Sequence, residues 1–344
     1  MNCEKTLIVG ADGYIGTMLC AKLQNDSYFG DIIGLDTMFY SDSKLYINNF
    51  NNNIIKKDIR EVKEKDLVSY KNVFYLSDLN DPTGVKYPDL KYKIDRTNAQ
   101  LFMQKCKSAG VKEFVYSSSA SVYGLFDGDA KEDDPLNPLT PYAECKCDNE
   151  MFLQSIADRN FHVICSRNAT VYGLSPNIRF DLVINYLCGS AVAKGEIELT
   201  SDGRAVRPFA HIEDICEAYI NLIKIPAEVR GDFLIVNNGD NDNNYLIFDI
   251  AKKISEMVGC RITYNHNNPD RRSYGLNTDK LNGFGIKHQR NIDIEINKML
   301  SFLKRIRLDE DFLNRRTHMR LKQIDYLLDT KQLSGNLLWK KSDV

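Results

Sequence analysis

A tyrosine and a lysine four residues apart are the side chains of this sequence best suited to acid–base chemistry. Tyr142 and Lys146 lie at the start of a predicted helix, and residues four apart on a helix share one face. A phenol is a poor base at neutral pH because its pKa is about 10, but a neighbouring ammonium favours the phenolate. Tyr142 is therefore a candidate general acid and base, with Lys146 as the residue that assists it.

Three consecutive serines, Ser117 to Ser119, stand at the end of a predicted strand. A hydroxyl such as that of Ser119 can hold the substrate oxygen whose proton Tyr142 takes or returns. A Tyr–Lys pair alone is common on exposed helices that have no catalytic role. The assignment therefore depends on the serines and on a phosphate-binding turn elsewhere in the chain.

A glycine-rich turn follows the first predicted strand and opens the first predicted helix. Its glycines, Gly10, Gly13 and Gly16, are each three residues apart, whereas the Rossmann fingerprint has spacings of about two and three. Gly10 permits a tight turn, Gly13 admits a pyrophosphate close to the backbone, and Gly16 lets the helix pack on the strand. The sequence therefore predicts a phosphate at the positive N-terminus of this helix.

Asp36 closes the second predicted strand, twenty residues after Gly16. A carboxylate at this position accepts a hydrogen bond from the 2′-hydroxyl of an adenosine ribose. The same charge repels a 2′-phosphate, and residues 36–43 contain no arginine to offset it. The sequence therefore predicts NAD rather than NADP as the cofactor.

Strand-like and helix-like segments alternate through the first half of the chain, which predicts an α/β fold with a Rossmann-type, doubly wound parallel sheet. Several strand segments are apolar at nearly every position, as a sheet covered by helices on both faces requires. The strand segments are 6–9, 32–36, 54–58, 73–76, 114–118 and 163–167, and the helical segments are 14–25, 95–109 and 142–157.

The domain prediction has three parts. Residues 1–172 form the NAD-binding Rossmann domain, to which later segments return; residues 173–307 form mainly a smaller mixed α/β lobe for the substrate; residues 308–344 form a C-terminal helical extension. The elements assigned to the smaller lobe are 180–194, 213–224, 233–236, 247–257 and 292–305.

The composition narrows the classes of partner. The 344 residues carry 45 basic and 47 acidic side chains, a net charge of −2, so neither nucleic acid nor an anionic membrane surface is an expected partner. The longest apolar segment, residues 182–193, contains polar residues and is too short to span a bilayer. The nine cysteines form no CxxC pair, which argues against disulfides and a metal site and favours reduced thiols in the cytoplasm.

Several motifs, in this order along the chain, resemble those of the extended short-chain dehydrogenase/reductase family and, within it, the UDP-galactose 4-epimerase-like group. They are GxxGxxG at 10–16, SSSASVYG at 117–124, YxxxK at 142–146, RNATVYG at 167–173 and RPFAHIED at 207–214. The resemblance covers about residues 5–290. Three further segments are similar to a branch of bacterial nucleotide-sugar epimerases, reductases and 4-dehydrogenases, namely residues 172–176, 179–183 and 269–274.

The resemblance implies a nucleotide-diphosphate sugar as substrate and assigns roles to individual residues. Ser119, Tyr142 and Lys146 would form the catalytic triad. The residues implied to contact NAD are Gly10, Gly13, Tyr14, Ile15, Gly16, Asp36, Asp58, Ile59, Leu76, Ser117, Tyr142 and Lys146, of which Asp58 and Ile59 would meet the adenine. The residues implied to contact the substrate are Ser119, Thr170, Arg207 and Arg272, and planar guanidinium groups such as the last two suit a diphosphate.

The resemblance also implies a homodimer, formed by packing two helices of each copy, and a role in polysaccharide biosynthesis. Six apolar residues would supply the dimer face: Phe102, Met103, Cys106, Met151, Phe152 and Ile156.

Four further positions carry expectations of their own. Asp78 stands where many relatives have a small residue beside the nicotinamide; a loop cap is the expected role, with a charge close to the cofactor as the alternative. Asp95 replaces an asparagine that often supports the site, and Pro208 replaces an aspartate. His211 is expected to be structural. Residues 117–124 also lack the acidic pair of 4,6-dehydratases, which argues against dehydration because elimination needs an additional acid and base.

The predicted reaction is reversible hydride transfer at a sugar ring hydroxyl, most simply at C4. Reduction of the keto sugar on its other face gives epimerisation, whereas its release gives a nucleotide-sugar 4-dehydrogenase or, in reverse, a 4-ketoreductase. A third hypothesis is an NAD-binding regulator without catalysis. Such a protein would be expected to have lost Tyr142 or Lys146, and both are present.

Overall fold

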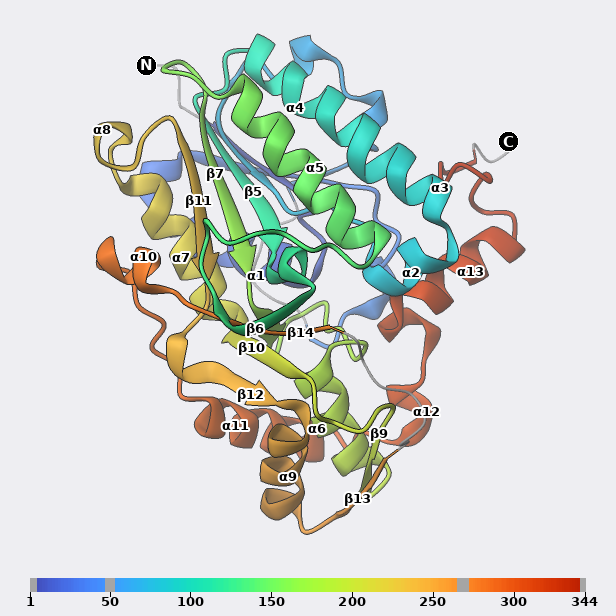
Figure 1. Ribbon diagram of the computed structural model, residues 1–344. Helices are drawn as coiled ribbons and strands as arrows, with labels where there is room; N and C mark the ends of the chain where they lie inside the picture. Colours follow the sequence, from blue (N-terminus) through green and yellow to red (C-terminus); the bar gives the residue numbers. More distant parts are fainter. Residues whose placement is uncertain (1–4, 47–52, 265–271, 341–344) are drawn as a thin grey trace.

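The computed structural model describes residues 5–46, 53–264 and 272–340. Its centre is a seven-stranded sheet in the order β11-β7-β5-β4-β1-β2-β3, with every neighbouring pair parallel. The strands are β1 Lys5–Val9, β2 Asp31–Asp36, β3 Ile54–Lys56, β4 Tyr70–Tyr75, β5 Glu113–Ser119, β7 His162–Asn168 and β11 Phe233–Asn238. The predicted doubly wound α/β sheet is confirmed (Figure 1).

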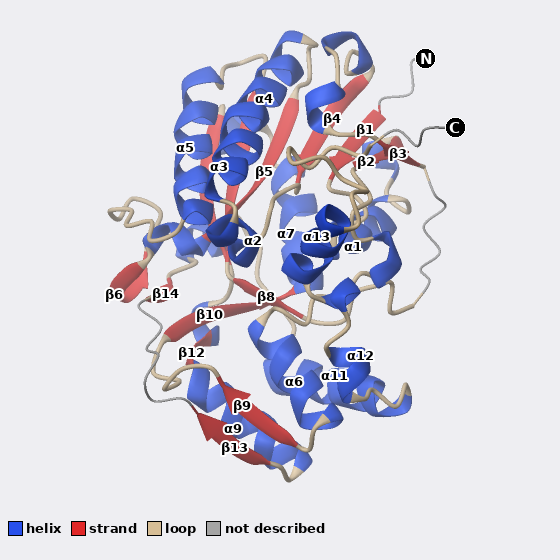
Figure 2. Cartoon of the chain, turned by 90° about the vertical axis from the view of Figure 1, so that its right-hand side faces the viewer, coloured by secondary structure: helices blue, strands red, loops and turns tan. Residues whose placement is uncertain are grey.

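Helices cover both faces of this sheet because its strands are apolar on both sides. In β1, Leu7 and Val9 belong to the core cluster beneath α4 (Ala99–Ser108) and α5 (Pro141–Ile156), whereas Ile8 belongs to the cluster beneath α1 (Tyr14–Leu23) and α7 (Ile212–Lys224). Successive strand residues point to opposite faces. Figures 1 and 2 show α4 and α5 side by side on one face.

Two segments assigned to the smaller lobe belong to the first domain. β11 pairs in parallel with β7, Phe233 opposite Val163, and forms the edge of the main sheet. α7 packs against α1 beneath that sheet. The grouping of residues 213–224 and 233–236 with the smaller lobe is therefore wrong, because sequence order does not reveal the sheet to which a late strand returns.

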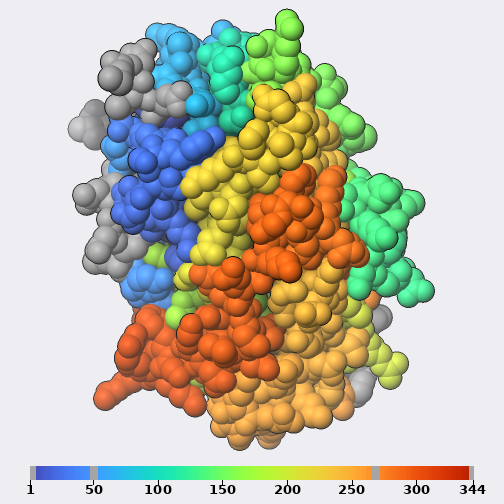
Figure 3. Space-filling model, turned by 90° about the vertical axis from the view of Figure 1, so that its left-hand side faces the viewer, coloured from blue at the N-terminus to red at the C-terminus, as the bar shows by residue number. Residues whose placement is uncertain are grey.

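The smaller lobe surrounds a third core cluster below the carboxyl ends of the main strands (Figure 2). Its strands form three small sheets: β8 Thr170–Tyr172 with β10 Val206–His211 and β12 Asn244–Leu246; β9 Glu196–Leu199 with β13 Arg261–Tyr264; and β6 Leu125–Ala130 with β14 Ser273–Leu276. Its helices are α6 Val183–Ala193, α9 Ile247–Val258 and α11 Ile292–Arg305. In Figure 3, residues of α7 (yellow), of α10 (Asp279–Gly283) and of α11 (both orange) form one continuous surface.

The C-terminal segment folds back onto the first domain. Here α12 (Glu310–Leu313) and α13 (Arg320–Asp329) are followed by a bridge between Leu333 and Trp339. Apolar residues of this segment, Ile324 among them, share a fourth core cluster with Phe39 and Leu79 of the first domain. The remaining helices are α2 Asp81–Lys86, α3 Pro88–Lys91, α8 Ala227–Arg230 and α10 Asp279–Gly283.

Half of the expected dimer face is core. Phe102, Met103 and Cys106 on α4 are completely buried within one chain, so they cannot form a surface between two copies. Met151 on α5 and its neighbour Leu101 on α4 are 60% and 55% exposed. Within the described residues, no helix has the length and apolar character needed to cross a membrane.

Candidate active site

The glycine turn has the geometry that its spacing predicted. Gly10 has a φ of +86°, a conformation that side chains with a Cβ rarely adopt. A Cβ on Gly16 would lie 2.1 Å from the carbonyl oxygen of Gly10, so α1 packs directly against the turn. Gly13 precedes the first residue of α1 with extended backbone and carries no side-chain cap. The first backbone N–H groups of α1 therefore face an anion site.

Two adjoining cavities open at this turn. The larger, about 640 Å³, is lined by the predicted contact residues Gly10, Gly13, Tyr14, Ile15, Gly16, Leu76, Ser117, Ser119, Tyr142, Lys146, Thr170, Arg207 and Arg272. The smaller, about 100 Å³, is lined by Asp36, Asp58 and Ile59 together with Gly10, Gly13 and Leu76. The residues singled out from the sequence thus meet at the carboxyl ends of the main strands, where ligands of open α/β sheets bind.

Asp36 ends β2 beside the turn. Its carboxylate accepts hydrogen bonds from the backbone N–H of Met38 at 2.7 Å and of Asp12 at 3.0 Å. Burial raises the pKa of Asp36 to about 6, although these two hydrogen bonds act in the opposite direction. The carboxylate is thus fixed in orientation at the cavity wall, where a ribose hydroxyl could donate to it.

The two residues predicted to meet the adenine lie at the smaller cavity, and one of them has an additional partner. Asp58 and Ile59 line the smaller cavity, but both oxygens of Asp58 are engaged by the guanidinium of Arg60, at 2.8 Å and 2.7 Å. Arg60 also donates to the backbone carbonyls of Asn336 and Leu337 in the C-terminal segment. Asp58 therefore also helps to hold that segment, a function that the sequence did not reveal.

The three serines at the end of β5 differ in their partners. The Ser117 hydroxyl lies 3.0 Å from the hydroxyl of Tyr219, and the Ser118 hydroxyl donates to Glu150 at 2.5 Å. Ser119 is half-buried at the cavity, where its oxygen accepts from the backbone N–H of Ser121 at 3.2 Å. Ser119 is therefore the serine whose hydroxyl remains best placed to meet a substrate.

Tyr142 and Lys146 lie on the first turns of α5. The helix begins there because Thr140 accepts a hydrogen bond from the Ala143 N–H at 3.3 Å and Pro141 occupies its first position. Lys146 is buried, donates to the carbonyl of Ser117 at 2.7 Å, and lies 5.3 Å from the centre of the Tyr142 ring. The predicted pair therefore shares one face and one cavity.

A second lysine lies beside the same tyrosine. The ammonium of Lys91, completely buried at the end of α3, is 4.6 Å from the centre of the Tyr142 ring. It pairs with Asp78, and with Asp95 at 3.0 Å. Asp78 in turn pairs with Lys146 at 2.8 Å. Two buried ammonium groups and two carboxylates thus form one network next to the candidate base.

This network corrects the role expected of Asp78. It caps no helix, since Asn80 accepts the capping hydrogen bond of α2; instead it is a cavity-lining charge between Lys91 and Lys146. The pKa of Asp78 is held low by these two lysines against its burial. Asp95 accepts from the backbone N–H of Leu79 at 2.9 Å, and burial raises its pKa to about 6. The alternative of a charge near the cofactor site is the one that the structure favours.

The two arginines implied to bind the diphosphate line the same cavity and contact each other. Arg207, buried on β10, donates to the carbonyl of Arg272 and lies over the ring of Tyr274. Arg272 pairs with Asp81 at 2.6 Å. Of the segment 269–274, residues 269–271 lie outside the described residues. Both arginines line the larger cavity.

Two further arginines of the cavity were not singled out from the sequence. Arg179 pairs with Asp181 at 3.0 Å, and Asp181 accepts from Asn80 at 2.7 Å. Arg320 reaches the cavity from the C-terminal segment. Arg179 lies within a segment used for the resemblance and was the easier to find; Arg320 has no motif around it.

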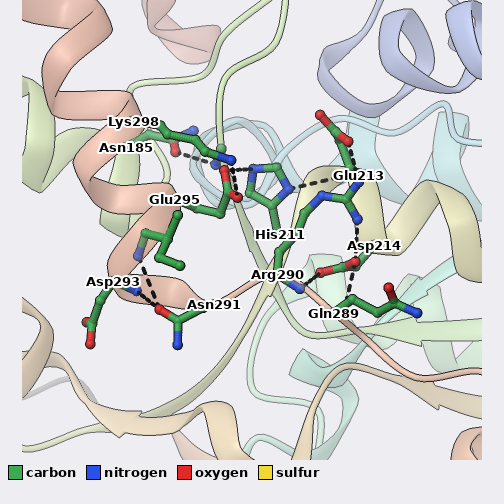
Figure 4. Close-up of polar contacts among 12 residues, drawn as sticks. Asn185, His211, Glu213, Asp214, Gln289, Arg290, Asn291, Asp293, Glu295 and Lys298 are labelled. Carbon is green, nitrogen blue, oxygen red and sulfur yellow. Dashed lines mark hydrogen bonds and ion pairs between the residues drawn. The ribbon is translucent and has the colours of Figure 1, made fainter.

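His211 is structural, as expected. It ends β10 and accepts a hydrogen bond from the Glu213 N–H at 3.4 Å, and its Nε2 lies 3.7 Å from Glu295 (Figure 4). Burial lowers the pKa of His211. Beside it, Arg290 pairs with Asp214 at 2.6 Å and so joins α7 to the segment that precedes α11.

The residues present fit NAD, and a cofactor-selectivity experiment tests the assignment of Asp36. We expect NAD to bind at least about tenfold, or ~1.4 kcal/mol, more tightly than NADP, because the carboxylate repels a 2′-phosphate. The preference should fall as the pH is lowered through about 6, where Asp36 becomes protonated and loses its charge. Calorimetric titrations across this range measure both effects.

The Asp36→Asn variant is the control for that experiment. Asparagine keeps an acceptor for the backbone but has no charge, so the selectivity and the part of its pH dependence that is due to Asp36 should both be reduced. NADP affinity equal to that of NAD in the unaltered protein would contradict the assignment.

Comparisons with known proteins agree with this geometry. The profile of the NAD dependent epimerase/dehydratase family matches residues 6–237. UDP-glucose 4-epimerase of Bacillus subtilis (strain 168) is 26% identical over 302 residues, which cover 75% of this chain and 83% of the relative. Human dTDP-D-glucose 4,6-dehydratase is 25% identical over 309 residues, which cover 82% of this chain and 85% of the relative.

A solved structure, MoeE5 in complex with UDP-glucuronic acid and NAD, superimposes with a TM-score of 0.76 and 25% identity. The superposition covers 88% of this chain and 99% of the MoeE5 chain. The family match spans most of the main sheet and includes the glycine turn, the serines and the Tyr–Lys pair. The chain therefore belongs to the NAD dependent epimerase/dehydratase family, whose members are NAD-using enzymes of the extended short-chain dehydrogenase/reductase type.

Proposed function

We propose that this enzyme is a nucleotide-sugar epimerase or oxidoreductase that acts by reversible oxidation of a ring hydroxyl, at C4. The observation that carries the proposal is a single cavity whose lining includes two sets of residues, here called the first wall (Ser119, Tyr142 and Lys146) and the second wall (Arg207 and Arg272). A sugar between these walls would present a hydroxyl to the acid–base group while its diphosphate meets the guanidinium groups.

The chemistry follows from the residues of the first wall. Tyr142 takes the proton of the sugar hydroxyl, and Ser119 holds the same oxygen by a hydrogen bond. Lys146 and Lys91 stabilise the negative charge that develops on the tyrosine oxygen. NAD, when bound, supplies the group that accepts and returns the hydride. Reversal returns the proton from Tyr142 to the oxygen.

The substrate class is supported by the second wall and by the relatives. Guanidinium groups bind phosphate oxygens through paired donors, and the guanidinium of Arg207 donates to the backbone carbonyl of Arg272. UDP-glucose and UDP-glucuronic acid are named for similar proteins. A nucleotide-diphosphate sugar is therefore the proposed substrate, without a choice of base or sugar.

Epimerisation is preferred to dehydration because the residues next to the third serine are not acidic. The relatives include a 4,6-dehydratase, but elimination needs an additional acid and base. The positions after Ser119 are occupied by Ala120 and Ser121, and neither side chain is a carboxylate. Net oxidation or reduction by the same residues remains the alternative, and it is distinguished by experiment.

The test incubates the purified enzyme with UDP-, GDP-, dTDP- and CDP-sugars. Sugar stereochemistry is followed by NMR and the NADH band by absorbance. An epimerase gives a new stereoisomer with no net NADH, whereas a dehydrogenase accumulates NADH in proportion to keto sugar. Loss of water from the sugar would overturn the preference against dehydration.

Removing either arginine tests the proposed diphosphate site. Arg207→Ala or Arg272→Ala should weaken binding of the nucleotide sugar, or of the nucleoside diphosphate alone, by about 1–3 kcal/mol, the scale of a charge-assisted hydrogen bond. NAD affinity should not change. The control is Arg204→Ala, since Arg204 is exposed and outside the cavity. Unchanged substrate affinity in both variants would remove these arginines from the site.

The proposal also covers the roles of the domains, the location of the enzyme, its oligomeric state and the use of its product. Cofactor binding is assigned to residues 1–172 with the returning α7 and β11, and substrate binding mainly to the rest of 173–307. A cytoplasmic location is supported by the cysteines of the described residues, all of which are free. Exposed Leu101 and Met151 on adjacent helices support a homodimer, and polysaccharide biosynthesis is the proposed use of the product.

A further inference from the structure

Arg320, the first residue of α13, is a buried cation bound by neutral groups. Its side chain is 4% exposed. Its guanidinium donates to the hydroxyl of Ser43 at 3.2 Å and to the side-chain and backbone oxygens of Asn177 at 2.8 Å and 3.3 Å. It also lies over the ring of Tyr40, 4.2 Å from its centre. These contacts orient the charge but do not neutralise it.

Two other buried arginines of this protein have carboxylate partners. Arg167 pairs with Glu150 at 2.7 Å, and Arg230 pairs with Glu113. In the described part of the chain, no carboxylate lies within ion-pair distance of Arg320. Burial, together with the charge of Arg179, lowers its pKa to about 10, although the more distant carboxylates of Asp181 and Asp36 act in the opposite direction. An unpaired buried charge is costly, so the position is one that a bound anion would stabilise.

The location of Arg320 indicates which anion. It lines the larger cavity together with Tyr40 and with Gly10, Gly13 and Tyr14 of the glycine turn. The N-terminus of α1, a helix of 10 residues, opens at this turn without a side-chain cap. A helix N-terminus attracts phosphate through its free N–H groups and its dipole. Two independent anion-binding features therefore line the same cavity.

We propose that Arg320 binds the pyrophosphate of NAD, so that the C-terminal segment, residues 308–340, forms one wall of the cofactor site. This inference rests on NAD as the cofactor and does not depend on which sugar is the substrate. It assigns a ligand-binding role to a segment that lies outside the matched family region, which ends at residue 237.

The C-terminal segment is anchored to the strand ends that surround the cofactor site. Gln323 donates to the carbonyl of Phe39 at 2.9 Å, and Trp339 donates to that of Thr37 at 2.6 Å. Both acceptors lie in the loop that follows Asp36. Arg60, next to the adenine end, donates to the carbonyl of Asn336 at 2.7 Å. The cofactor would thus be held between the glycine turn and the C-terminal segment, residues 308–340.

The diphosphate of the nucleotide sugar has the same chemistry and enters the same cavity, so the experiment must separate the two sources. Apo enzyme is titrated with NAD, ADP-ribose, adenosine and UDP. For Arg320→Gln we expect NAD and ADP-ribose affinities to fall about 10–100-fold, the range of one to two charge-assisted hydrogen bonds. Adenosine and UDP affinities should be unchanged, because neither presents the NAD pyrophosphate to Arg320.

A matched control removes a positive charge from the same segment. Arg315 is exposed and lies over Phe312, outside the cavity. Arg315→Gln should leave the affinity for all four ligands unchanged. The salt dependence of NAD affinity should become shallower for Arg320→Gln and not for Arg315→Gln, since one cation–phosphate contact has been lost.

A measurement on the unaltered protein covers the case in which Arg320→Gln does not fold. Hydrogen exchange of residues 316–330 should slow when ADP-ribose is added and should not respond to adenosine. Exchange that does not respond to ADP-ribose would overturn the proposal. Equal loss of adenosine and NAD affinity in Arg320→Gln would show a structural role. Selective loss of UDP affinity would place Arg320 at the sugar nucleotide. Each of these two results also overturns the proposal.

Discussion

Replacing Tyr142 by phenylalanine is expected to lower kcat by about 10²–10⁴-fold, the usual contribution of a general acid–base group. The change removes one hydroxyl and keeps the ring that packs beside Lys91 and Lys146. It does not touch the glycine turn or Asp36, so folding and NAD affinity should be retained. Steady-state rates on an active nucleotide sugar measure the loss of kcat, and calorimetric titrations measure whether NAD affinity is retained.

The other members of the catalytic group should separate by what they contact. Ser119→Ala should impair the same chemical step without changing NAD affinity, because its hydroxyl faces the substrate region of the cavity. Lys146→Ala should lower both activity and NAD affinity. A folded Tyr142→Phe enzyme that matched the unaltered protein on every active substrate would refute the proposed mechanism.

Replacing Lys91 by methionine is expected to lower the free energy of unfolding by about 3–5 kcal/mol, the cost of breaking a buried ion pair. Lys91 is completely buried and pairs with both Asp78 and Asp95. Asp78 keeps Lys146 as a partner in the variant, whereas Asp95 loses its cation. Urea denaturation with a shared slope for variant and unaltered protein gives the difference.

The double variant Lys91→Met/Asp95→Asn tests whether the loss arises from the unpaired charge of Asp95. Asparagine can still accept the hydrogen bond from the Leu79 N–H, so most of the lost stability should return. Lys93→Met is the matched control, because Lys93 is exposed and its ammonium contacts only the side chain of Asn336 at 3.2 Å among the interactions described. A Lys91→Met protein as stable as the Lys93→Met control would contradict a stabilising network.

The effect of Lys91→Met should grow with pH. The pKa of Asp95 is raised to about 6 in the folded protein, above the unfolded value of about 3.9, so its contribution to stability is present at low pH and declines as the pH rises through about 6. Without Lys91 the pKa of Asp95 rises further, and the decline extends to higher pH. The two proteins should therefore differ least near pH 4 and most above pH 7.

The helix and strand pattern was predictable because it is repeated locally. Leu7, Ile8 and Val9 alternate between two core clusters, and the apolar character that causes this can be seen in consecutive residues of the sequence. The return of β11 to the edge of the sheet was not predictable in this way. Phe233 pairs with Val163, seventy residues earlier, and no local pattern identifies such a partner.

The same difference separates Asp78 from Tyr142 and Lys146. Residues four apart share one face of any helix, so the spacing of Tyr142 and Lys146 predicts from the sequence alone that their side chains lie together. The sequence predicts a cap at Asp78 and does not show its partners, because Lys91 and Lys146 come from two other elements. Charge alone did not indicate whether it would cap a loop or complete a buried network.

By itself the sequence determined the glycine turn, the acid that ends β2, the Tyr–Lys pair and the doubly wound sheet, because each depends on residue types at short and fixed spacings. Only the tertiary structure decided that Lys91 lies beside Tyr142 and that Arg320, from the far end of the chain, lines the same cavity as the glycine turn. A buried charge takes its partner from whichever segment packs against it, so its role is set by the fold and not by its neighbours in sequence.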